Sequence, residues 1–195
     1  NKHKWSPPKR SCLFYREEWT MYVARVLYPV EVLGPGKRVG IWFCGCPRRC
    51  EGCSNPELWE FQERYKTTPE HIHELVMQIA KTHPIDGFTI TGGDPMYQEI
   101  ELQRLLCLLR GISDDVIVYT GYRYDELSPE ALNGEYVEAL NDNSVLRGSS
   151  NQKVYILDRS KKEKYSSFFK TERNRIQNFF TSDGVVSVGI HRPGF

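Results

Sequence analysis

Three cysteines within eight residues are the feature of this chain that most plainly carries chemistry. Cys46, Cys50 and Cys53 have the spacing C-x3-C-x2-C. Thiolates at this spacing can hold one corner of a [4Fe-4S] cube, and because the cube has four irons, one iron is left without a protein ligand. A second molecule can bind and react at that iron. The spacing therefore predicts an iron–sulfur cluster with one open coordination position.

Zinc is the alternative metal that these cysteines leave open. A zinc site normally takes four ligands, often as two separated pairs, and Cys44 is the ambiguous fourth here. We interpret Cys44 as the end of a strand and a non-ligand, because a fourth structural ligand would close the open position. Disulfides between such close neighbours are disfavoured, since a bridge stabilises by closing a long loop. Cys107, inside the apolar run 105–109, is interpreted as a small core residue.

A glycine-rich segment about forty residues further on is the second candidate for chemistry. Residues 91–95 read Thr-Gly-Gly-Asp-Pro. Gly92 and Gly93 carry no Cβ, so a ligand can approach the backbone closely, and strand-end carbonyls with Asp94 can accept hydrogen bonds from an ammonium group. The alternative is that this segment is an ordinary turn.

The elements that must position these two segments alternate between strand and helix. Strands are predicted within 21–33 and over 39–43, 87–91, 116–119 and 185–190, and helices from 68 through 79 and over 100–109 and 124–132. Such alternation indicates βαβ units and a mainly parallel sheet, which binds ligands at the carboxyl ends of its strands. Both segments follow predicted strands, so we expect one composite site.

Composition limits the classes of protein to consider. The chain has 195 residues and 39% hydrophobic content, enough for one domain with a proper core. The net charge of +1 gives no long-range attraction to nucleic acid or to an anionic membrane. Neither a bilayer-spanning apolar run nor the apolar core of a signal peptide is found, so we expect a cytoplasmic protein without nucleic-acid or membrane partners.

The motifs together resemble the radical S-adenosylmethionine (radical SAM) superfamily over about residues 28–157. Within it they resemble the activating enzymes of anaerobic (class III) ribonucleotide reductase, a glycyl-radical enzyme activase branch. Most superfamily members have an aromatic residue before the third cysteine, whereas this branch and this chain have glycine, Gly52. The segments that carry the resemblance are 34–38 (Gly-Pro-Gly-Lys-Arg), 50–55 (Cys-Glu-Gly-Cys-Ser-Asn) with Trp59, 92–95 (Gly-Gly-Asp-Pro), 119–122 (Tyr-Thr-Gly-Tyr) and 146–152 (Leu-Arg-Gly-Ser-Ser-Asn-Gln).

The resemblance implies an α/β fold, an incomplete (β/α) radical SAM-type barrel with a mainly parallel sheet. We expect a core domain at 21–157, an N-terminal extension at 1–20 and a C-terminal extension at 158–195 packed on the core. The implied reaction begins when the reduced cluster cleaves S-adenosyl-L-methionine to methionine and a 5′-deoxyadenosyl radical. That radical takes a hydrogen atom from a glycine of a partner protein. The implied electron donor is of the flavodoxin or ferredoxin type.

The resemblance also implies the site residues. Cys46, Cys50 and Cys53 would hold the cluster, and no catalytic side chain is expected beyond the cluster and the cofactor. The segment 147–151, which includes Arg147, is interpreted either as a segment that binds the cofactor or shapes the groove for the partner, or as a turn. The candidates for contact with S-adenosylmethionine are Gly52, Ser54, Gly92, Gly93, Asp94, Thr120, Ser149 and Asn151.

The chain departs from the branch between residues 127 and 135. The branch usually has an apolar strand ending in Asp-Gly there, and only Ser-Pro-Glu-Ala-Leu-Asn-Gly remains at 128–134. Two other functions stay open. One is a radical SAM enzyme that modifies a small molecule or a peptide, and the other is a non-catalytic iron–sulfur or zinc module.

Overall fold

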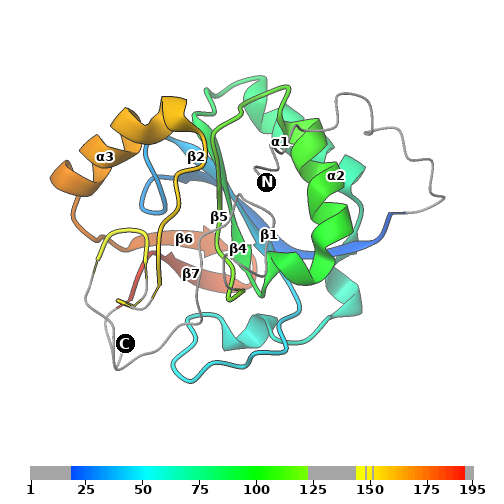
Figure 1. Ribbon diagram of the computed structural model, residues 1–195. Coiled ribbons are helices and arrows are strands. Elements are labelled where there is room, and N and C mark those ends of the chain that lie inside the picture. Colours follow the sequence, from blue (N-terminus) through cyan, green and yellow to red (C-terminus); the bar gives the residue numbers. More distant parts are fainter. Residues whose placement is uncertain (1–18, 123–143, 148, 151, 192–195) are drawn as a thin grey trace, which may run out of the picture.

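The computed structural model describes residues 19–122, 144–147, 149–150 and 152–191 (Figure 1). The predicted helix over 124–132 and the shortened segment at 128–134 lie outside the described residues, as does Asn151. None of the described helices is long and apolar enough to cross a membrane.

A five-stranded sheet with the order β3-β1-β2-β4-β5 forms the centre of the protein (Figure 1). Its middle and one edge are parallel: β2 (Arg38–Phe43), β4 (Gly87–Gly92) and β5 (Val116–Val118). β1 (Met21–Val30) runs antiparallel to β2, and β3 (Lys66–Thr67) runs antiparallel to β1. The mixed α/β fold with a parallel centre agrees with the expectation from the sequence.

The antiparallel direction of β1 has a simple cause. Only residues 31–37 separate β1 from β2, and a parallel pair needs a crossover of about a dozen residues or more. The described strands form an open five-stranded sheet and a separate two-stranded sheet, so the barrel stays a prediction.

The register of the parallel strands brings the two chemical segments together. All six residues of β2 are buried, as expected for a strand with both faces covered. Phe43, the last residue of β2, is the register partner of Gly92, the last residue of β4. Cys44 and Gly93, which follow these strands, therefore leave the sheet side by side.

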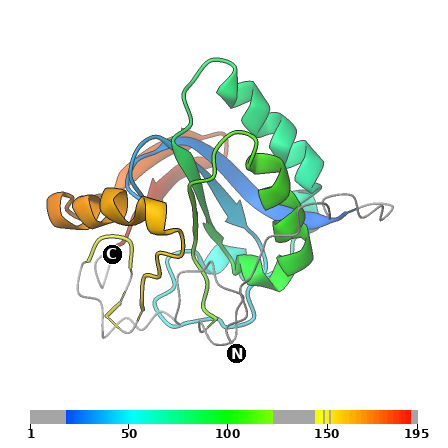
Figure 2. The ribbon, with the colours of Figure 1, turned by 45° about the horizontal axis from the view of Figure 1, so that its top comes forward.

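Two helices, α1 (Pro69–Ala80) and α2 (Glu99–Leu109), cover one face of the sheet (Figure 2). The hydroxyl of Thr68 caps α1 by accepting a hydrogen bond of 3.1 Å from the backbone N–H of His71. The main core lies between these helices and the sheet. It includes Val39, Ile41, Phe43, Ile72, Val76, Phe88, Ile90, Leu102, Leu105 and Leu109.

Cys107 corrects one expectation from the sequence. It was expected in the core, but it is exposed on α2. The buried residues of α2 are Leu102, Leu105 and Leu109, and a residue two positions after Leu105 falls on another side of the helix. The apolar run around Cys107 hid this periodicity.

A hairpin covers the opposite face of the sheet. Its strands are β6 (Gln177–Thr181) and β7 (Gly184–Val188), so the strand expected at 185–190 is confirmed with slightly shifted bounds. The side chain of Gln177 donates to the carbonyl of Pro29 at 2.7 Å and accepts from the N–H of Glu31 at 3.0 Å, which joins the hairpin to the end of β1. A second core lies between hairpin and sheet, with Val30, Leu33, Trp42, Leu58 and Val188 as its buried members.

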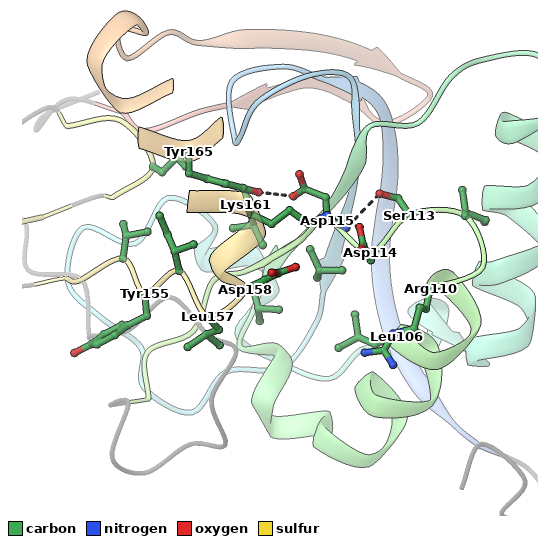
Figure 3. A pocket seen from close by; sticks show the side chains of 17 residues that line it. Leu106, Arg110, Ser113, Asp114, Asp115, Tyr155, Leu157, Asp158, Lys161 and Tyr165 are labelled. Atoms are coloured by element: carbon green, nitrogen blue, oxygen red, sulfur yellow. Dashed lines mark hydrogen bonds and ion pairs between the residues drawn. The ribbon is translucent and has the colours of Figure 1, made fainter. Parts of the chain in front are cut away.

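A buried ion pair holds the beginnings of the parallel strands and the helix α3 (Lys162–Thr171) together. The Nη1 atom of Arg38, which has no exposed surface, lies 3.2 Å from Oδ1 of Asp115. Lys164 and Tyr165 of α3 both donate to the same carboxylate. Figure 3 shows the hydrogen bond from Tyr165. Burial raises the pKa of Asp115, but the charge of Arg38 and the hydrogen bonds from α3 outweigh it and leave that pKa below its ordinary value.

A cavity of about 810 Å³ lies beside this ion pair, between β5 and the segment 154–158 (Figure 3). The remaining described elements are short 3-10 turns. They are η1 (Pro56–Leu58), η2 (Glu63–Tyr65), η3 (Pro95–Gln98) and η6 (Arg159–Lys161).

Candidate functional site

Backbone hydrogen bonds fold the cysteine loop back on itself. The N–H of Gly45 donates to the carbonyl of Leu58 at 2.8 Å, and the N–H of Cys46 donates to the carbonyl of Trp59 at 2.7 Å. Gly45 has φ +103° and Gly52 has φ +71°, conformations that residues with a Cβ rarely adopt. Hydrogen bonds between backbone groups therefore hold the two ends of the loop together, and the chain turns at Gly45 and Gly52.

The three motif cysteines line one cavity. Cys46, Cys50 and Cys53 are all partly buried there. Burial raises the pKa of the Cys46 thiol, and hydrogen bonds from the backbone of Arg48 and Arg49 offset only part of the rise. Among the described residues, no group of three His, Cys, Asp or Glu side chains stands at metal-binding distances. The three thiols would have to turn toward a common centre to share a cluster.

Cys44 is separate from the other three. It is fully buried, and its thiol donates a hydrogen bond of 2.6 Å to the carbonyl of Glu60. Cys44 follows the last residue of β2, as expected, and it is not part of the cavity wall. Its position suits a structural thiol, and its role as a non-ligand stays a prediction.

The glycines at the end of β4 are needed for contact between two backbones. The N–H of Gly93 donates to the carbonyl of Phe43 at 2.8 Å. A Cβ on Gly92 would lie 2.3 Å from that carbonyl oxygen, and a Cβ on Gly93 would lie 2.6 Å from the carbonyl oxygen of Gly45. The sequence suggests that the missing side chains leave room for a ligand, whereas in the structure the cysteine loop occupies that room.

Asp94 is buried and fixes the strand ends. Its side chain is 2% exposed and accepts hydrogen bonds from Oγ1 of Thr120 at 2.7 Å, from the N–H of Gly121 at 2.8 Å and from the N–H of Met96 at 3.1 Å. Burial raises the pKa of Asp94, and these hydrogen bonds offset only part of the rise. Both oxygens of Asp94 are therefore already engaged by donors of the protein itself.

Arg48 is a member of this site that the predicted set of contact residues omitted. Its Nε atom lies 3.8 Å from Oδ2 of Asp94, and its guanidinium carbon lies 4.8 Å from the ring centre of Tyr122. Among the described residues, the buried Nε atom has no hydrogen-bond partner. Its position between the first two cysteines was the available signal. Arg48 links the cysteine loop to the ends of β4 and β5 and puts a positive charge in the cavity wall.

The cavity brings most of the predicted residues together. It has a volume of about 190 Å³. Of the predicted contacts, Gly52 lines a neighbouring groove instead, and Ser149 is buried outside the cavity wall, where its N–H donates to Oε1 of Gln152 at 3.2 Å. The predicted residues that line the cavity are Cys46, Cys50, Cys53, Ser54, Gly92, Gly93, Asp94 and Thr120.

The C-terminal hairpin also reaches the cavity, which the sequence did not reveal. Residues 187–191, at the end of β7 and just after it, form part of the cavity wall. Burial lowers the pKa of His191, the last described residue of this segment. Contacts between segments this far apart in the sequence have no local signal.

Comparison with known proteins shows the family to which this chain belongs. Residues 32–155 match the model of the 4Fe-4S single cluster domain family. The chain is 30% identical to the anaerobic ribonucleoside-triphosphate reductase-activating protein of Enterobacteria phage T4 over 142 residues, covering 66% of this chain and 90% of the relative. The protein of that name from Escherichia coli K12 is 30% identical over 148 residues, covering 67% of this chain and 96% of the relative.

The chain also matches a second group of activating enzymes over a shorter stretch. The pyruvate formate-lyase-activating enzyme of Staphylococcus aureus USA300 is 32% identical over 93 residues, covering 43% of this chain and 36% of the relative. The cysteine loop and the family match define an iron–sulfur protein of the α/β class. The chain belongs to the 4Fe-4S single cluster domain family and is a radical SAM activating enzyme.

Proposed function

We propose that this enzyme cleaves S-adenosylmethionine reductively at a [4Fe-4S] cluster and generates a glycyl radical on a partner such as an anaerobic ribonucleotide reductase. The observation that carries the proposal is the shared cavity, which is lined by Cys46, Cys50 and Cys53 and by the end of β4. When bound, the reduced cluster supplies one electron to the cofactor, which yields methionine and a 5′-deoxyadenosyl radical. The protein positions the reactants and excludes competing reactions.

The donor set fits the cluster. Thiolates are the ligands that iron–sulfur irons prefer, and three partly buried cysteines line one cavity, where their thiols would turn toward a common centre to hold the cluster. Burial of the Cys46 thiol raises its pKa, and an iron ion would reverse that effect by binding the thiolate. Cys46, Cys50 and Cys53 are therefore the proposed ligands, and Cys44 remains outside the set.

The strand ends fit the methionine part of the cofactor. Carbonyls at Gly92 and Gly93 are proposed to accept hydrogen bonds from its ammonium group. Asp94 is proposed to act mainly by holding the loops after β4 and β5, since Thr120 and Gly121 already donate to it. The guanidinium of Arg48 suits a carboxylate, because its buried Nε has no hydrogen-bond partner in the part of the chain that the structure describes.

The other residues predicted to contact S-adenosylmethionine differ in whether they line the cavity. Ser54 and Thr120 line the cavity and are proposed to contact the cofactor. Gly52 and Ser149 do not line it, so their proposed contact rests on the resemblance alone, as does that of Asn151.

The proposed partner follows from the relatives. Two groups of relatives are named for activating anaerobic ribonucleoside-triphosphate reductase and pyruvate formate-lyase. The chain spans 90% or more of the reductase-activating relatives and 36% of the other, so a reductase is the better-supported partner class. An electron donor of the flavodoxin or ferredoxin type completes the proposal.

Anaerobic reconstitution with iron and sulfide tests the function. The reconstituted protein, reduced with dithionite and given S-adenosylmethionine, is expected to form 5′-deoxyadenosine, and adding the reductase should give a doublet glycyl-radical EPR signal. Reductase with glycine deuterated at Cα should pass its label to 5′-deoxyadenosine. A label recovered instead from a small molecule, with no protein radical, would replace the partner protein with a small substrate.

A further inference from the structure

A groove of about 990 Å³ lies against the cysteine loop, next to the cofactor cavity. It is lined by residues 24–27 of β1, by residues 52–57 of the cysteine loop and by residues 181–187 of the C-terminal hairpin. The hairpin lies beyond residues 32–155, the part that matches the family model. One wall of the groove therefore lies outside the part of the chain that matches the family model.

The wall formed by the hairpin is the edge of β7. Successive residues of a strand point to opposite faces, yet Gly184, Val185, Val186 and Ser187 all line the groove. β6 contributes only its last residue, Thr181, to the wall. The groove therefore follows the edge of β7 that points away from β6.

This edge is open to another strand. β6 and β7 form a two-stranded sheet, and no other strand pairs with β7 in the part of the chain that the structure describes. An unpaired edge presents backbone N–H and C=O groups to any extended chain beside it. Peptides that bind in this way gain affinity from main-chain hydrogen bonds and specificity from their alternate side chains.

The hairpin holds this edge in place. Val188 and Phe179 pack into the second core, and Gln177 is hydrogen-bonded to the end of β1. Near the turn, two apolar side chains stay outside: Val185 is 59% exposed and Phe180 is 87% exposed. They are register partners, but only Val185 lines the groove.

The groove adjoins the cofactor cavity. Cys53, Ser54, Asn55, Ser187 and His191 line both. A chain lying along β7 would therefore pass the cysteine loop and reach the cavity. Hydrogen transfer requires the donor carbon and the radical carbon to be nearly in contact, so a substrate segment needs such a path.

We infer that the groove binds an extended peptide by adding it as a strand to β7, and that this peptide is the glycine-bearing segment of the partner protein. The second half of this inference rests on the proposed function. A strand-like backbone explains why the groove follows an edge, and the residues that the groove shares with the cofactor cavity place such a strand next to the cofactor.

Val185→Lys is the test variant and Phe180→Lys is its matched control. Both side chains are exposed, apolar and at the same register position of one hairpin, and they differ in whether they line the groove. A lysine on a strand edge opposes pairing with another strand. The probe is the anaerobic ribonucleoside-triphosphate reductase of phage T4, whose activating protein is 30% identical to this chain. Affinity is measured anaerobically by biolayer interferometry, with the yield of glycyl radical per 5′-deoxyadenosine as the second readout.

We expect Val185→Lys to weaken reductase binding by about tenfold and to lower the radical yield per 5′-deoxyadenosine in proportion, and Phe180→Lys to change the affinity less than about threefold. Equal effects of the two variants, or none from Val185→Lys, would overturn the groove assignment. A wild-type protein that forms 5′-deoxyadenosine but does not bind the reductase would overturn both the groove assignment and the partner class. A protein that binds the reductase through Val185 without cleaving S-adenosylmethionine would refute the proposed reaction and keep the groove.

Discussion

Asp94 and Thr120 join the carboxyl ends of two neighbouring parallel strands through a hydrogen bond of 2.7 Å between Oδ1 and Oγ1. Asp94 follows β4 and Thr120 follows β5, and both side chains are buried. Arg48 extends this link to the cysteine loop. The cofactor cavity is thus held by one carboxylate that connects three separate segments.

Replacing Asp94 by Ala should loosen the cavity. The change leaves the hydroxyl of Thr120 and the N–H groups of Gly121 and Met96 without an acceptor, and buried donors left this way cost about 1–3 kcal/mol of stability. We expect a lower free energy of unfolding in urea and weaker S-adenosylmethionine binding in an equilibrium titration. Thr120→Val removes one of these hydrogen bonds and should cost about 0.5–1.5 kcal/mol. Unchanged cofactor affinity in Asp94→Ala would remove this residue from the site.

The four neighbouring cysteines should differ in whether their replacement by Ala abolishes cluster binding. Cys46→Ala, Cys50→Ala and Cys53→Ala are each expected to abolish cluster binding, because these three line the cavity with the required spacing. Cys44→Ala should keep the cluster, because the Cys44 thiol is buried elsewhere and donates to Glu60. Iron and sulfide content after anaerobic reconstitution, with the visible absorption spectrum, checks this. Complete loss of iron in Cys44→Ala would contradict the open-site arrangement.

Local patterns in the sequence predicted the strands at the centre of the sheet and the two helices that cover it, but not α3 or β6. The Thr68 cap and the spacing of Ile72 and Val76 marked α1, and the short apolar runs marked β2 and β4. The rule that parallel sheets bind ligands at carboxyl strand ends then placed the cysteine segment beside the glycine segment, as the register of Phe43 with Gly92 confirms.

Features that depend on distant contacts were not predictable. The hairpin reaches the cavity because Gln177 and Val188 pack on β1 and β2, and no local pattern encodes that contact. Cys107 was wrongly assigned to the core because an apolar run masks which side of a helix is buried. The reason for glycine at position 93 also needed the structure, since it depends on the carbonyl of Gly45.

Gly93→Ala should disturb both the cluster and the cofactor. The added Cβ would lie 2.6 Å from the carbonyl oxygen of Gly45, a backbone atom that cannot turn aside as a side chain can. Gly45 precedes Cys46, the first of the proposed ligands, so we expect lower iron content after reconstitution as well as weaker S-adenosylmethionine binding. Gly111→Ala is the control, because its nearest neighbour would be 3.8 Å away. Normal iron content in Gly93→Ala would show that the cysteine loop tolerates the displacement.

The buried pair of Arg38 and Asp115 should make the fold sensitive to acid. The pKa of Asp115 is below its ordinary value in the folded protein, so the unfolded chain takes up a proton at a higher pH than the folded one. The pair therefore stabilises the fold fully above the ordinary aspartate pKa of about 4, and this stabilisation is lost as the pH falls through the lower folded pKa.

Asp115→Asn tests this pair directly. It leaves the buried Arg38 and the donors Lys164 and Tyr165 without the charge that they face, and breaking a buried pair typically costs about 3–5 kcal/mol. Urea unfolding at pH 7, 5, 4 and 3 should show a lower free energy of unfolding at pH 7 than in the wild type and a smaller fall toward pH 3. Asp114→Asn is the control, since that neighbouring carboxylate is 65% exposed and forms an ion pair with Lys161 at the surface. If Asp115→Asn lost as much stability between pH 5 and pH 3 as the wild type, another carboxylate would be the source of the acid sensitivity.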